Sequence, residues 1–122
     1  MMKLLLIDDD AFLRDMYATK FTASGYLVEA ADSGLAALRI LESDSEFDVI
    51  LLDMIMPGMT GAELIKEIYQ QHPDIKAKCI VLSNQGQPED IEDAKKAGAI
   101  GYIIKAESVP SEVIKKVEAF CK

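Results

Sequence analysis

The chain has 122 residues, and 21 acidic residues against 13 Lys or Arg give a formal net charge of −8. Half of the residues are hydrophobic, which excludes a disordered chain, and the length suits one domain covering residues 1–122. The acidity excludes direct nucleic-acid binding, and no apolar run approaches the roughly 20 residues that cross a membrane. The start lacks a signal-peptide pattern, so we expect a cytoplasmic protein.

Short apolar runs alternate with amphipathic stretches along the chain. The runs predict strands at Lys3–Ile7, Tyr26–Ala30, Val49–Leu52, Cys79–Leu82 and Ile100–Ile104. The first, third and fourth runs are apolar on both faces, as in parallel strands that helices cover on two sides. Strict alternation of strands and helices predicts an α/β fold with a right-handed, doubly wound, open parallel sheet.

Capping residues mark where the helices begin. Ser33 is placed to cap the second helix, and Thr60 and Glu63 have capping-box spacing for the third. Pro88 and Pro110 fall in the first turns of the last two helices, where a missing N–H costs little.

The two cysteines and the single histidine have no metal-ligand spacing. Cys79 lies in an apolar run and is expected in the core, and Cys121 is expected to be partly exposed. We expect no disulfide between them. His72 precedes a proline and is expected at the end of a helix rather than on a metal.

Charged and hydroxyl side chains follow four of the predicted strands. The first strand ends at Asp8 and Asp9, the third at Asp53, the fourth at Ser83 and the fifth at Lys105. Because ligands of open parallel sheets bind at the carboxyl ends of the strands, we expect these side chains to meet at one edge.

Clustered carboxylates repel one another, so such a group needs a cation. Lys105 supplies one positive charge, and carboxylate and water oxygens are the ligands that Mg²⁺ prefers. A carboxylate held beside Mg²⁺ and a lysine is a known type of phosphoryl-accepting nucleophile. Asp10, in contrast, is expected to cap the helix that follows.

These segments resemble the receiver domain of two-component response regulators, in its single-domain, chemotaxis-regulator-like form. The resemblance rests on the Asp8-Asp9 pair, residues 53–61 (DMIMPGMTG), the pair Leu82-Ser83 and residues 101–105 (GYIIK), in the right order over nearly the whole chain. It implies a flavodoxin-like (βα)5 fold with strand order 2-1-3-4-5.

The resemblance implies a role for each matched position. These roles are the phosphoacceptor (Asp53), the Mg²⁺ ligands (Asp8, Asp9, Asp53 and the backbone carbonyl of Ile55), the phosphoryl contacts (Ser83 and Lys105) and the switch pair (Ser83 and Tyr102). Without the family, Tyr102 would be interpreted as a core aromatic residue at a sheet edge.

The resemblance also implies partners. The phosphoryl donor is a sensor histidine kinase or a histidine phosphotransfer protein, and the output is an unidentified downstream protein. Phosphorylation shifts a two-state equilibrium and remodels the surface of the fourth helix, fifth strand and fifth helix, through which a phosphorylation-dependent homodimer is one expected form of output. Such a protein catalyses its own phosphotransfer and dephosphorylation and is not a turnover enzyme.

Three positions depart from the family pattern. Thr60 replaces a usual Asp, with little expected effect, and Asn84 replaces a small residue and is expected to narrow access to Asp53. Ala106 replaces a proline that is typically cis. A non-proline cis bond costs about 3 kcal/mol, so we expect a trans bond with the loop and Lys105 shifted.

Two further positions concern the lifetime of the phosphoryl group. Ile55 and Gln85 stand two residues beyond the acceptor and the hydroxyl, where the resemblance suggests that side chains tune hydrolysis. An apolar Ile55 cannot orient water by hydrogen bonding, so we expect a persistent phosphoryl group.

Three other classes of protein compete with this interpretation. A small phosphatase of the haloacid dehalogenase type would use Asp8 and Asp10, but it leaves Asp53 unexplained. A flavin-binding protein is rejected because three aspartates after the first strand repel a phosphate. A phosphorylation-independent interaction module stays open because of Asn84 and Ala106, and it has no need for Mg²⁺.

Overall fold

Five parallel strands form one sheet in the computed structural model, which describes residues 2–121. The strands are β1 (Lys3–Ile7), β2 (Leu27–Ala31), β3 (Val49–Leu52), β4 (Lys78–Ser83) and β5 (Gly101–Ile104). Their order across the sheet is β2-β1-β3-β4-β5, and every neighbouring pair is parallel. The predicted α/β fold and its strand order are therefore confirmed.

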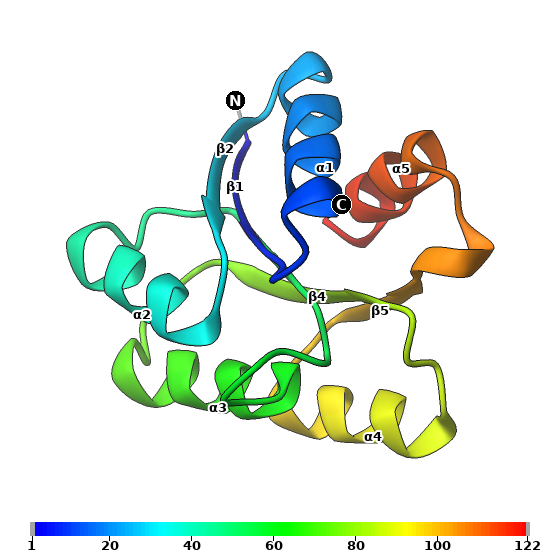
Figure 1. The fold of residues 1–122 in the computed structure, drawn as a ribbon. Coiled ribbons are helices and arrows are strands. Elements are labelled where there is room, and N and C mark those ends of the chain that lie inside the picture. The colour runs from blue at the N-terminus through cyan, green and yellow to red at the C-terminus, as the bar shows by residue number, and fades with distance from the viewer. Residues whose placement is uncertain (1, 122) are drawn as a thin grey trace.

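Helices cover both faces of this sheet (Figure 1). They are α1 (Ala11–Ala23), α2 (Gly34–Ser43), α3 (Gly61–Gln71), α4 (Pro88–Ala97) and α5 (Pro110–Phe120), with a short 3₁₀ turn η1 (Lys105–Glu107) before α5. Helices α1 and α5 lie on one face, and α2, α3 and α4 lie on the other. No helix within residues 2–121 is long and apolar enough to span a bilayer.

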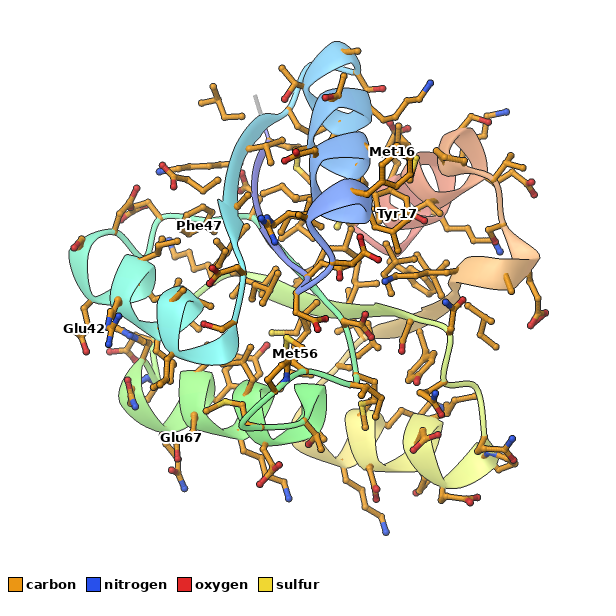
Figure 2. The ribbon with its side chains drawn as sticks, viewed as in Figure 1. Met16, Tyr17, Glu42, Phe47, Met56 and Glu67 are labelled. Atoms are coloured by element: carbon orange, nitrogen blue, oxygen red, sulfur yellow. The ribbon has the colours of Figure 1, made fainter. Side chains whose placement is uncertain are left out.

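The central strands divide their side chains between two hydrophobic cores. Leu4 and Leu6 point to the α1–α5 side, where they pack with Tyr17 of α1, whereas Leu5 points to the opposite core. Figure 2 shows Tyr17 on the first side and Met56 between the sheet and α3 on the second. Burying one such leucine stabilises the fold by about 2 kcal/mol, which explains why these strands are apolar on both faces.

The second strand begins one residue later than the sequence predicts. Tyr26 is buried, but its N–H donates to the carbonyl of Phe21 at the end of α1. Its ring packs edge-to-face on Phe21, with the ring centroids 5.0 Å apart. Because its donor is used by the helix end, the chain pairs with β1 only from Leu27 onward.

The predicted caps are present. Ser33 accepts a hydrogen bond in the first turn of α2, Thr60 and Glu63 form a reciprocal capping box at α3, and Asp10 caps α1. The two helices that were predicted to start at prolines do so. The helix starts are therefore determined locally by residue type.

The cysteines and the histidine lie where the sequence places them. Cys79 is completely buried, and burial raises the pKa of its thiol to about 11. Cys121 is half-buried, and neither cysteine forms a disulfide. His72 is the C-terminal cap of α3, where its main-chain N–H donates to the carbonyl of Ile68. The predicted places of these three residues, in the core, partly exposed and at a helix end, are therefore confirmed.

Candidate functional site

The carboxyl ends of three strands bring Asp8, Asp53 and Lys105 into direct contact. The Nζ atom of Lys105 lies 2.8 Å from Oδ2 of Asp8 and 2.9 Å from Oδ2 of Asp53. The side chains are 7%, 3% and 13% exposed for Lys105, Asp8 and Asp53. One ammonium group therefore bridges two carboxylates in a largely desolvated position at the edge of the sheet.

The charge on Lys105 is stabilised by these carboxylates. Burial lowers the pKa of the ammonium group, but the hydrogen bonds to Asp8 and Asp53 and the negative charges of both carboxylates together outweigh burial and raise the pKa above its usual value. The lysine is thus protonated at neutral pH. With Asp9 beside it, the cluster holds three carboxylates against one ammonium group, which leaves an excess of negative charge.

The chemistry of the carboxylates fits a divalent cation. Asp8, Asp9 and Asp53 each present one carboxylate oxygen, and these oxygens lie within 4.8 Å of one another. Asp9 is exposed, so one side of this acidic site is open to water. An all-oxygen donor set that is open to solvent suits Mg²⁺, which keeps several waters in its coordination shell.

Ile55 stands at the mouth of the acidic site. Its N–H donates to Oδ1 of Asp53 over 3.3 Å, and its side chain is 54% exposed. The two oxygens of Asp53 therefore have different partners, since Oδ2 contacts Lys105. An apolar, solvent-facing side chain is held next to the candidate acceptor.

The loop between β1 and α1 contains a contact that the sequence analysis missed. Arg14 donates from Nη1 to the main-chain oxygen of Asp8 over 2.9 Å. Oδ1 of Asp8 accepts the N–H of Asp10 over 3.0 Å. The signal for Arg14 is a basic residue four positions after the helix cap, which places it on the first turn facing back to the strand end.

A second missed residue is Gly61, at the start of α3. Its N–H donates to the carbonyl of Met54 over 2.7 Å. A Cβ atom on this glycine would lie 2.5 Å from the carbonyl oxygen of Asp53 and 3.0 Å from Cα of Met54. The start of α3 therefore approaches the main chain of Asp53 and Met54 so closely that only glycine fits.

Ser83 and Tyr102 meet at the loop between β4 and α4. Ser83 is buried at the end of β4, and its Oγ accepts the N–H of Gln85 over 3.2 Å. The hydroxyl of Tyr102 donates to the carbonyl of the same Gln85. Burial raises the pKa of Tyr102 to about 12, so this hydroxyl keeps its proton at neutral pH. One loop residue thus connects the two predicted switch side chains.

The strand register places Ser83 near Asp53. Leu52 pairs with Val81, so Asp53 stands opposite Leu82 and Ser83 is one residue further along. Asn84, which follows Ser83, is exposed. Its predicted effect on access to Asp53 stays a prediction.

The position of Lys105 corrects one expectation. No cis peptide bond occurs within residues 2–121, so the bond before Ala106 is trans, as expected. The side chain of Lys105 nevertheless reaches the acidic site, where its Nζ contacts both Asp8 and Asp53. A 3₁₀ turn begins at Lys105, and the flexible four-carbon stem of the side chain reaches the carboxylates from there.

Comparison with known proteins agrees with this arrangement. The sequence matches the response regulator receiver domain over residues 4–118, and the chain belongs to this family. The predicted family is confirmed, which removes the dehalogenase-type and flavin-binding interpretations.

Individual relatives include both short and longer proteins. The chain is 35% identical to the chemotaxis protein CheY of Thermotoga maritima, with 98% of each chain covered. The crystallised CheY4 of Vibrio cholerae superposes with a TM-score of 0.90 at 32% identity, with 98% of each chain covered. Response regulator SaeR of Staphylococcus aureus is 33% identical over 96% of this chain, which spans about half of SaeR (49%).

Proposed function

We propose that this chain is a phosphorylation-activated switch whose acceptor is Asp53. We assign the receiver domain to residues 1–122. The observation that carries it is the bridge from Lys105 to Asp8 and Asp53, with Asp9 alongside. A buried ammonium group between strand-end carboxylates has no evident packing role, whereas phosphoryl transfer requires a carboxylate beside cations.

The transfer starts from the Asp53 carboxylate, whose Oδ1 accepts the N–H of Ile55 and whose Oδ2 contacts Lys105. This carboxylate attacks the phosphorus of a phosphohistidine, an oxygen–phosphorus bond forms, the phosphorus–nitrogen bond breaks, and the leaving imidazole takes up a proton from solvent. In the phosphorylated state, the ammonium group of Lys105 contacts a phosphoryl oxygen in place of Oδ2 of Asp53, its partner in the unphosphorylated protein. Asp8, Asp9, Asp53 and the carbonyl of Ile55 would hold Mg²⁺, which would supply further positive charge for the phosphoryl oxygens.

The switch is proposed to run through Gln85. The Oγ–H group of Ser83 turns toward the phosphoryl group, which weakens its acceptance of the Gln85 N–H. Tyr102 holds the other side of the same residue, so the loop and β5 move together. Helix α4 follows this loop and buries only Ala94 and Ala97, so little free energy opposes its displacement.

Two kinds of partner follow from the proposal. A sensor histidine kinase or histidine phosphotransfer protein supplies the phosphoryl group, and a downstream protein, or a second copy of the chain, recognises the α4-β5-α5 surface. A shallow surface depression next to Lys105 supports the first contact. Phe12, which is 77% exposed, and Val109 line it together with Lys105, whose Nζ contacts Asp53, so a donor protein bound there lies beside the candidate acceptor.

The decisive experiment is intact-protein mass spectrometry after incubation with acetyl phosphate. We expect wild type to gain one phosphoryl group only with Mg²⁺ and Asp53→Asn to gain none. Asp10→Asn is the matched control, because it removes a neighbouring charge while asparagine still caps α1. A folded wild type that gains nothing contradicts the proposal and favours a phosphorylation-independent interaction module.

The exposed side chain of Ile55 is expected to prolong the phosphorylated state. In Ile55→Asn, an amide at this position can hydrogen-bond the attacking water. A hydrogen bond worth about 1 kcal/mol corresponds to about fivefold faster dephosphorylation. The measurement is loss of the phosphoryl mass over time after removal of acetyl phosphate.

Ile55→Leu serves as the control for this rate. It keeps an apolar side chain at the mouth of the site, so we expect a rate close to that of wild type. An asparagine variant that dephosphorylates at the same rate or more slowly shows that Ile55 does not limit access of water.

A further inference from the structure

Arg14 occupies a position that the proposed phosphoryl transfer does not use. Strand pairing on both sides of β1 ends at Ile7, so the carbonyl of Asp8 lies beyond the ladder. Asp8 is 2% exposed, which leaves this carbonyl little access to water. Within residues 2–121, the one hydrogen bond that it accepts comes from Nη1 of Arg14.

This hydrogen bond fixes the direction of the main chain as it leaves the sheet. A buried carbonyl without a partner costs about 1–3 kcal/mol, and a charged donor makes the bond stronger than a neutral one. Arg14 is itself anchored, because its N–H donates to the carbonyl of Asp10 in the first turn of α1. Arg14 therefore holds the turn from strand to helix at two points, through its side chain at Asp8 and through its main-chain N–H at Asp10.

Asp9 lies between these two held residues. Its carboxylate is exposed, and it faces the oxygens of Asp8 and Asp53 within 4.8 Å. Since the side chain is not packed, its direction follows from the main chain on either side. Loss of the hydrogen bond to the Asp8 carbonyl therefore moves the carboxylate oxygen of Asp9 relative to those of Asp8 and Asp53.

We propose that Arg14 is a positioning residue for the cation site, which orients the Asp8-Asp9 segment through the Asp8 carbonyl. The inference rests on the proposed function for its use of Mg²⁺. Residues that hydrogen-bond to metal ligands without contacting the metal typically change metal affinity 10–100-fold when they are mutated. A purely electrostatic role predicts the opposite change in affinity. A positive charge near the site repels Mg²⁺, so removing the charge of Arg14 would tighten Mg²⁺ binding.

The test is calorimetric titration of the unphosphorylated protein with Mg²⁺. We expect Arg14→Met to bind Mg²⁺ about tenfold more weakly than wild type. Arg14→Lys keeps a charged donor and is expected to recover part of this loss. Arg39→Met is the matched control, since it makes the same change of charge on the exposed surface of α2 and is expected to leave the affinity unchanged.

Thermal unfolding without Mg²⁺ separates positioning from a structural role. Unchanged or tighter binding by Arg14→Met overturns the inference. A methionine variant that does not fold, together with a lysine variant of wild-type affinity, also overturns it, because Arg14 then acts on folding alone. Absence of Mg²⁺ binding by wild type contradicts the metal site of the proposed function instead, so the two failures are distinct.

Discussion

Lys105→Met is expected to lose about 3 kcal/mol of unfolding free energy at pH 7 without Mg²⁺. The substitution leaves the carboxylates of Asp8 and Asp53, which are 3% and 13% exposed, without the ammonium group that bridges them. Breaking a buried ion pair from one side is costly because the remaining charges are neither hydrated nor paired. Urea unfolding measures the loss.

Saturating Mg²⁺ is expected to restore much of this stability, since a cation bound by the same carboxylates replaces the lost charge. Lys115→Met removes an exposed lysine of α5 and is expected to change the unfolding free energy by less than about 0.5 kcal/mol. Equal stability of Lys105→Met and Lys115→Met would contradict the interpretation of Lys105 as the counter-ion of the site.

The difference between wild type and Lys105→Met also depends on pH. Because the pKa of Lys105 is raised in the folded protein, its stabilisation is complete below the ordinary lysine pKa and is lost as pH rises through the raised value. The two proteins should therefore converge in stability at strongly alkaline pH. Tyr17 also contributes to the difference at alkaline pH, because burial raises its pKa and the charge of Lys105 counteracts this rise in wild type only.

Gly61→Ala is the second substitution with a large expected effect. Its Cβ meets main-chain atoms of Asp53 and Met54, which cannot move aside as a flexible side chain does. We expect a loss of about 2–3 kcal/mol of unfolding free energy. We also expect slower phosphorylation from acetyl phosphate, because the start of α3 and the acceptor segment must separate. Urea unfolding and the phosphoryl mass gain measure the two effects.

Gly34→Ala is the matched control for this substitution. Its Cβ would approach the Sδ and Cγ atoms of Met59, whose flexible side chain can rotate away, and alanine is the better helix former. We expect little loss of stability and an unchanged rate of phosphorylation. If Gly61→Ala matches Gly34→Ala in unfolding free energy and in phosphorylation rate, the contact between Gly61 and the main chain of Asp53 is not tight enough to require glycine.

The arrangement of the sheet was predictable because its signals are local and periodic. Runs that are apolar on both faces predict buried parallel strands, and residues such as Ser33 and Thr60 cap helices through bonds to their own first turn. Tyr26 is the informative exception. Its apolar ring fits the strand pattern, but a hydrogen bond to the end of α1 removes its donor from the ladder.

The order of residues along the chain is enough to predict which side chains gather at the carboxyl edge of the sheet. Asp8, Asp53 and Lys105 each follow a strand directly, and parallel strands end at a common edge, so their meeting follows from topology. How these side chains are held depends on the packing of separate segments. A basic residue four positions after the helix cap points to Arg14, but its bond to the Asp8 carbonyl requires the strand end and α1 to lie at the right distance. The approach of Gly61 to Asp53 depends in the same way on the spacing between β3 and α3, which a residue pattern does not give.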